Sequence, residues 1–386
     1  MHTQSYVLQF LDIVKIIFVL LKLIMNLSVL KMKKIASNFI SYLLLLFITG
    51  TQAQSIYGGI EIGDKGVKMY VINVQNTKSG TFEIQNFWTE NVETASGMPI
   101  NGNLAQQDID TAGSITLKNY KKMLTEYKIE NQNIYIAASS RTAMAHNIGD
   151  LAKKVKTLTN KDLDIITSSL EAKLLSKGCI PPKNYLNSLV LDIGERNTKG
   201  GYINAVNGAN IFYPITVDIG TITLTEKIIK RNKQKPSLDY NQASFDYLPT
   251  LREEFDTIYS NRPESIKKEN IYLSGGALWA FYTLFNEKSA ANNFTEIRYE
   301  DIVLLKFIIE NNFEKIVKIS LTNPHVKEVL DTYSQKNLIA SNSILLTALE
   351  EIPNIKNKKI FFAKQGEIAW LISFIMERSK GSIQVY

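Results

Sequence analysis

The chain of 386 residues is 45% hydrophobic, 21% charged and 10% aromatic, which excludes disordered, collagen-like and coiled-coil proteins and suggests two domains of ordinary size. The net charge of +7 falls to +3 without residues 1–53, which hold five basic residues and one acid. A chain so balanced is not expected to bind nucleic acid. The single cysteine, Cys179, excludes an internal disulfide, a cysteine zinc cluster and a CxxC redox pair.

Residues 1–53 have the features of a targeting segment. Met32, Lys33 and Lys34 make a positive start, residues 39–50 form an apolar run, and Ala53 is a small residue before Gln54. This order predicts a secretory signal peptide that is cut after Ala53, and a periplasmic or secreted mature chain. An uncleaved membrane anchor is the alternative.

Residues 1–31 do not fit a signal peptide. They hold a second apolar stretch, 13–29, which Lys15 and Lys22 interrupt. Either translation begins at Met32 instead of Met1, or residues 6–30 form a membrane helix with a costly charge in mid-span. After signal cleavage we expect no stable membrane span.

The first domain, 54–182, is predicted to open with three strands and to end at a proline pair. An apolar strand over 56–63 ends in glycine, and 67–74 and 81–88 follow it. The segment 99–113 is rich in Gly, Asn, Gln and Asp, which predicts a loop. The elements expected after it are a helix at 115–127, a strand at 133–138, a helix at 148–158, a strand at 163–166 and a helix at 168–177 capped by Ser168.

The second domain, 183–386, repeats this order. Its expected strands are 188–193, 199–206, 209–214, 270–273 and 359–363, and its expected helices are 219–232, 241–259, 277–285, 300–311, 324–335, 338–350 and 365–379. The repeat predicts two α/β domains whose hairpins, 60–68 and 192–200, face each other across a cleft. Their glycine turns suit phosphate binding. The last helix is expected to pack back on the first domain.

Six short segments, taken in order, carry a resemblance to a known family: Gly59–Gly66, Ala137–Ala143, Ile166–Leu174, Asp192–Lys199, Asp218–Glu226 and Leu273–Ala277. They resemble the phosphate loops and neighbouring motifs of the Ppx/GppA phosphatases, which include exopolyphosphatases and guanosine pentaphosphate phosphatases. The resemblance spans nearly the whole mature chain. It implies an α/β fold of two actin-like ATPase (ribonuclease H-like) domains with an interdomain cleft.

The resemblance also implies roles for particular residues, because the family removes a terminal phosphate with water, a divalent metal and carboxylates. Glu171 matches the glutamate that orients or deprotonates the water, and Glu61 and Asp192 match the magnesium ligands. The positions that match phosphate-binding residues are Gly63, Lys65, Gly66, Arg141, Gly194, Thr198, Lys199, Gly275 and Gly276. Without the resemblance, Glu171 would be read as a solvated helix residue and Gly275-Gly276 as an ordinary turn.

The chain departs from the family pattern at its second loop. Residues 195–197 are Glu, Arg and Asn where the family has small glycines and serine, and Lys199 replaces a glutamate. An ammonium group cannot hold magnesium or accept a proton at neutral pH. His146 and His325 have no ligand partners at metal spacing.

Two function classes follow from this pattern. The first is an exported exopolyphosphatase-like hydrolase that releases terminal phosphate from polyphosphate or a related phosphate chain. Its activity is expected to be weak or lost. If it is active, it is expected to use magnesium. The second is a non-catalytic protein of the same fold that binds a phosphate chain or nucleotide, or serves as a cell-envelope interaction module. A homodimer is open in both cases.

Overall fold

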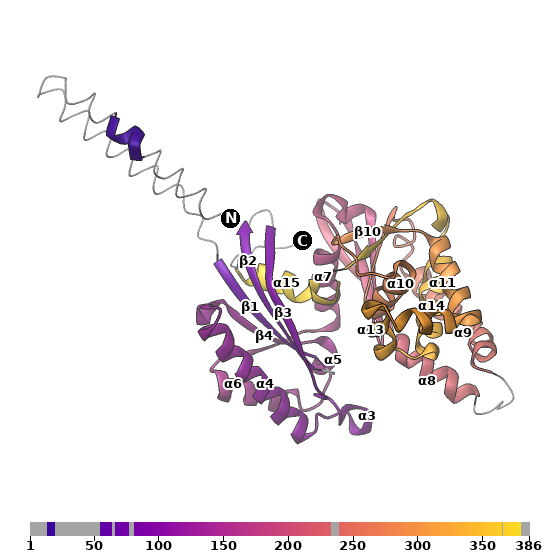
Figure 1. Cartoon of the computed structure of the whole chain (residues 1–386), viewed down its shortest axis with the longest axis horizontal. Helices are drawn as coiled ribbons and strands as arrows, with labels where there is room; N and C mark the ends of the chain where they lie inside the picture. Colours follow the sequence, from indigo (N-terminus) through magenta and orange to yellow (C-terminus); the bar gives the residue numbers. More distant parts are fainter. Residues whose placement is uncertain are drawn as a thin grey trace, which may run out of the picture. The chain divides into compact units, whose positions relative to one another are not determined.

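The computed structural model describes residues 14–19, 55–63, 66–76, 81–232, 239–364 and 366–379. Its contacts divide the chain into two compact units, Met1–Ser55 and Ile56–Tyr386. In the first unit residues 14–19 are helical, and the remainder of the predicted targeting segment lies outside the described residues. None of the described helices is long and apolar enough to cross a membrane. The second unit holds the elements that follow (Figure 1).

A five-stranded sheet forms the first lobe of this unit. Its strands lie in the order β3-β2-β1-β4-β5; β4 is parallel to β1 and to β5, and β3 is antiparallel to β2. The strands are β1 (Ser55–Gly63), β2 (Gly66–Asn76), β3 (Thr81–Asn91), β4 (Ile134–Ala138) and β5 (Leu163–Ile165). Two helices, α4 (Gln106–Thr125) and α6 (Ile148–Thr159), cover one face of the sheet through a buried apolar cluster.

The predicted loop over 99–113 is wrong at both ends, because a short helix covers Met98–Asn101 and α4 begins at Gln106. The Asp108 carboxylate accepts hydrogen bonds from the amides of Gly97 and Ala105, at 3.2 and 3.1 Å, and from Ser96 Oγ at 2.8 Å. Polar side chains that satisfy a helix amino terminus give a segment the same composition as a loop.

A six-stranded sheet forms the second lobe, in the order β10-β11-β9-β6-β7-β8. Its strands are β6 (Ser188–Ile193), β7 (Thr198–Val206), β8 (Ala209–Val217), β9 (Asn270–Ser274), β10 (Phe294–Ile297) and β11 (Lys359–Ala363). The helices of this lobe are α8 (Thr221–Asn232), α9 (Tyr240–Asn261), α10 (Gly276–Asn286), α11 (Tyr299–Asn311), α12 (Phe313–Ser320), α13 (Pro324–Thr332) and α14 (Gln335–Glu350). The strand β10 and the helix α12 were not predicted, because both are short.

Two further helices, α7 (Ser168–Cys179) and α15 (Gly366–Ser379), form a middle layer between the sheets. Their apolar side chains join one buried cluster that includes Tyr57 of β1 and Val190 of β6. The unit therefore stacks as helices, sheet, helices, sheet and helices. The short elements are α3 (Met98–Asn101), α5 (Ser140–Ala143), η1 (Asn131–Asn133), η2 (Pro182–Asn187) and η3 (Ile355–Asn357). This architecture confirms the prediction of two α/β domains with a repeated strand order.

The close pairing of β6 and β7 depends on Gly200. A Cβ at this position would lie 1.9 Å from the carbonyl oxygen of Val190, a contact that backbone movement alone can relieve. We expect Gly200→Ala to lower the free energy of unfolding by about 2 kcal/mol or more. The matched control is Gly149→Ala in α6, whose Cβ would meet nothing within 4 Å and should stabilise by about 0.5 kcal/mol. Urea unfolding of both variants measures the difference, and equal midpoints would contradict the expectation.

Candidate active site

The alternation of the two central strands directs one carboxylate from each sheet into the middle layer. On β1, Ile60 and Ile62 pack toward α4 and α6, so Glu61 lies on the opposite face with Tyr57. On β6, Leu191 packs toward the outer helices of the second lobe, so Asp192 lies on the opposite face. Both acids therefore face the middle layer, near the ends of their strands.

The carboxylate of Glu171 enters the same space from α7. The helix begins after Thr167, whose Oγ1 accepts from the amide of Leu170 at 3.2 Å, so the cap is Thr167 and not Ser168 as predicted. Glu171 follows in the first turn, where the helix dipole favours a negative charge. It is 2% exposed, and its Oε2 accepts a hydrogen bond from the amide of Ser140 at 2.7 Å.

Lys199 lies among these acids. It is the cross-strand partner of Asp192, so both side chains point to the same face. Its Nζ forms an ion pair with Glu171 Oε1 and lies 4.0 Å from Asp192 Oδ2. Burial disfavours the ammonium, but the charges of Glu171, Asp192 and Glu61 outweigh it and raise the pKa of Lys199 above its usual range.

The same pair sets the ionisation of Glu171. Burial alone would raise the pKa of this carboxyl, but the Lys199 ammonium and the hydrogen bond from Ser140 outweigh burial and hold it below its usual range. Glu171 is therefore an ionised carboxylate with two partners. A carboxylate with a lowered pKa is a weak general base.

A hydrogen bond from a third strand, β9, fixes the carboxylate of Asp192. Ser274 is its partner on β9, and Ser274 Oγ donates to Asp192 Oδ1 at 2.7 Å. The next residue, Gly275, has a φ of +91°, and a Cβ there would lie 2.4 Å from the carbonyl oxygen of Ile193. The turn from β9 into α10 thus requires glycine, which keeps the backbone close to the carboxylate.

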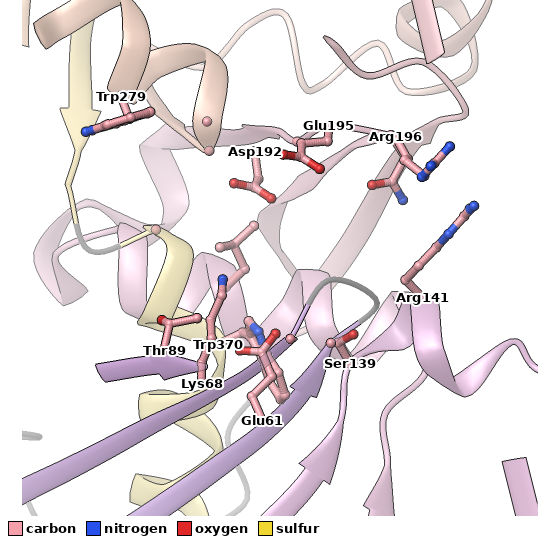
Figure 2. Close-up of a pocket in the computed structure, with 18 of the residues that line it drawn as sticks. Glu61, Lys68, Thr89, Ser139, Arg141, Asp192, Glu195, Arg196, Trp279 and Trp370 are labelled. Carbon is pink, nitrogen blue, oxygen red and sulfur yellow. The ribbon is translucent and has the colours of Figure 1, made fainter. Parts of the chain in front are cut away.

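These groups line one cleft of about 690 Å³ between the lobes (Figure 2). Of the residues predicted for the site, the following line it: Glu61, Gly63, Gly66, Arg141, Glu171, Asp192, Gly194, Lys199, Gly275 and Gly276. Gly63 and Gly194 share this cleft, as the repeated strand order predicts. Lys65 lies outside the described residues.

Thr198 is not among the lining residues. Its Oγ1 donates to the carbonyl oxygen of Ile219 at 2.8 Å, and the residue is fully buried on the side of α8. Neighbouring residues on a strand point to opposite faces, so the side chains of Thr198 and Lys199 cannot both enter the cleft.

The loop Gly194–Asn197 is fixed by α8. The amides of Thr221 and Ile222 donate to the carbonyl oxygens of Gly194 and Glu195, at 3.0 and 2.6 Å. The first amides of α8 are therefore occupied by the loop and do not point into the cleft. Figure 2 shows Arg141 and Arg196 at one end of the cleft, one from each lobe.

Several lining residues were missed from the sequence. Lys68 lies on the same face of β2 as Tyr70, so strand alternation alone could have placed it near Glu61. Trp279, Tyr333 and Trp370 form aromatic walls; they come from α10, the end of α13 and α15, respectively. No sequence pattern indicates that these elements meet.

The described residues do not fit a divalent metal of the kind implied by the resemblance. Magnesium prefers oxygen ligands in near-octahedral order. Glu61 and Asp192 could supply oxygens, but Glu171 is paired with Lys199, which also lies beside Asp192. Within the described part of the chain, no group of three or more His, Cys, Asp or Glu side chains is arranged to hold a metal.

A protein-family model and a known protein each match part of this chain. Residues 73–262 match the model of the Ppx/GppA phosphatase family. A bifunctional 3-dehydroquinate synthase/phosphatase of Fusobacterium nucleatum is 33% identical over 120 residues, which are 30% of this chain and 18% of that protein. The chain thus spans less than a fifth of this relative's length.

Solved structures share the fold. A Ppx/GppA family protein of Aquifex aeolicus aligns with a TM-score of 0.64 and 19% identity, over 84% of this chain and 97% of that one. An exopolyphosphatase from Cytophaga hutchinsonii aligns with a TM-score of 0.60 and 15% identity, over 85% and 99% of the two chains. This chain therefore has the same two-lobed, actin-like ATPase fold as these proteins.

Proposed function

We propose, because this chain belongs to the Ppx/GppA phosphatase family, that it releases the terminal phosphate from polyphosphate or a related phosphate chain. The family match and the shared fold support a phosphoanhydride hydrolase in general. The observation that carries the proposal is the position of Glu171, a buried and ionised carboxylate at the wall of the cleft.

We assign binding of the phosphate chain to the cationic side chains that line the cleft. Arg141 and Arg196 lie at one end of it, Lys68 lies on β2, and Lys199 lies among the acids. Guanidinium groups bind phosphate oxygens in a bidentate manner, and an ammonium donates up to three hydrogen bonds. We assign the terminal phosphate to Lys199 and the following phosphates to the two arginines.

The chemistry then follows from Glu171. A water molecule that donates to this carboxylate attacks the terminal phosphorus, and the bond from that phosphorus to the bridging oxygen breaks. The proton of the water passes to Glu171, and the products are inorganic phosphate and a chain shortened by one phosphate. Because Lys199 lowers the pKa of Glu171, proton transfer is weakly driven and turnover is slow.

Family phosphatases generally depend on a divalent metal, but no step proposed here passes through one. Of the carboxylates Glu61, Glu171 and Asp192, Glu171 is paired with the Lys199 ammonium, which also lies 4.0 Å from Asp192 Oδ2. Phosphate charge is instead neutralised by the cationic side chains of the chain itself.

A second candidate is a protein that binds a phosphate chain without cleaving it. The ion pair between Glu171 and Lys199 favours it, because the carboxylate that would accept the proton is already neutralised. Both candidates use the same cleft and the same cations.

One experiment separates these candidates. The full chain is incubated with polyphosphate of defined length, and free phosphate and chain length are measured together. The hydrolase predicts phosphate release with chains shortened one unit at a time. Retained binding with no phosphate release would sink the hydrolase and support the binding protein. Cleavage into internal fragments would contradict both.

We propose that the protein works outside the cytoplasm, because of the basic, apolar and small-residue order at residues 32–53. We expect export to remove the chain up to Ala53, so that the mature form begins at Gln54. Amino-terminal sequencing of protein from the periplasmic and secreted fractions checks this. An intact Met1 or Met32 on exported protein would contradict it.

A further inference from the structure

We propose that Lys199 Nζ is a built-in cation that takes the place of a divalent metal between Glu61, Glu171 and Asp192, so that the cleft binds a phosphate chain without metal. The inference rests on the proposed function for its ligand. It concerns a property that the family match does not supply, because family phosphatases generally depend on a metal.

The position of Lys199 carries the argument. Its ammonium contacts Glu171 Oε1 and lies 4.0 Å from Asp192 Oδ2. The side chain of Lys199 is only 16% exposed to solvent. A magnesium ion bound to Asp192 Oδ2 at about 2 Å would lie at most about 6 Å from this ammonium. Two cations at that separation repel strongly where the surroundings are shielded from water.

The neighbours of Lys199 keep it in place. Glu171 cannot turn away easily, because its other oxygen accepts from the amide of Ser140 at 2.7 Å. Asp192 is held on its other oxygen by Ser274 Oγ at 2.7 Å. A cation fixed on two sides is suited to receive a phosphate oxygen.

The first test is a titration of the full chain with Mn²⁺, in which the electron paramagnetic resonance signal measures the concentration of free Mn²⁺. We expect the wild-type protein to leave Mn²⁺ free up to about 1 mM, and Lys199→Glu to bind one ion per chain at least tenfold more tightly. The matched control is Lys154→Glu, which breaks an ion pair with Asp110 at 2.7 Å outside the cleft and should behave as wild type. A single Mn²⁺ site in the wild type that Asp192→Asn removes would overturn the proposal, and this arm remains decisive even if Lys199→Glu fails to fold.

The second test is binding of tripolyphosphate in the presence of EDTA. We expect wild type to bind, Lys199→Arg to bind within a few-fold of wild type, and Lys199→Met to bind at least tenfold more weakly. Binding that requires added metal, or that Lys199→Met leaves unchanged, would overturn the proposal. The proposed hydrolase fails separately: metal-free binding without phosphate release would leave the role of Lys199 standing.

Discussion

Replacing Glu171 with glutamine should lower the rate of phosphate release by about 100-fold or more, because an amide cannot accept the proton of the attacking water. Glutamine keeps the size of the side chain, and its oxygen can still accept from the amide of Ser140. Binding of tripolyphosphate should be unchanged or tighter, since Lys199 loses a competing negative partner. The rate and the binding constant are measured on the same preparation.

The matched control is Glu328→Gln, which makes the same change at another glutamate of the cleft. We expect its rate to stay within a few-fold of wild type, because Glu328 lies on α13 and has no proposed part in the proton transfer. If Glu171→Gln and Glu328→Gln lowered the rate equally, Glu171 would be only a contributor to the charge of the cleft.

An aspartate in place of Ile375 should unfold the protein or lower its free energy of unfolding by about 4 kcal/mol or more. Ile375 is fully buried on α15 in the middle layer, and its Cδ1 lies 2.5 Å from where a Cβ on Gly59 of β1 would be. A carboxylate there would be buried against the first sheet. Because the middle layer joins both sheets through one cluster, we expect both lobes to unfold in a single transition.

The comparison for this change is Ile165→Asp on β5, where the side chain is 46% exposed. The same substitution should cost about 1 kcal/mol there, because the carboxylate stays in water. Thermal unfolding followed by circular dichroism distinguishes the two variants. Two separate transitions in Ile375→Asp would contradict a middle layer that couples the lobes.

Much of the fold could be predicted because the first strand of each lobe is a short apolar run with a glycine at its end or directly after it. The strands β1 and β6 show this pattern at Gly63 and Gly194, and their repetition predicted two lobes with one cleft. The start of α4 could not be predicted, since the residues that satisfy its first amides, such as Asp108, are also typical of loops. The edge strand β10 depends on its pairing with β11, which is a tertiary contact.

Many of the residues that line the cleft could be predicted from the sequence, but their contacts could not. Strand alternation could have shown that Thr198 and Lys199 point to opposite faces. The ion pair between Lys199 and Glu171 joins β7 to α7, and no spacing along the chain reveals it. Trp370 enters the cleft from α15, near the end of the chain, only because that helix packs between the sheets.

The most direct measurement of the central claim is a crystal structure of the full chain with a phosphate-chain analogue that cannot be hydrolysed, grown in EDTA. The account predicts a terminal phosphate within hydrogen-bond distance of Lys199 Nζ, with the next phosphates near Arg141 and Arg196. An analogue bound outside this cleft, or a complex that forms only when a metal ion bridges Glu61 and Asp192, would contradict it.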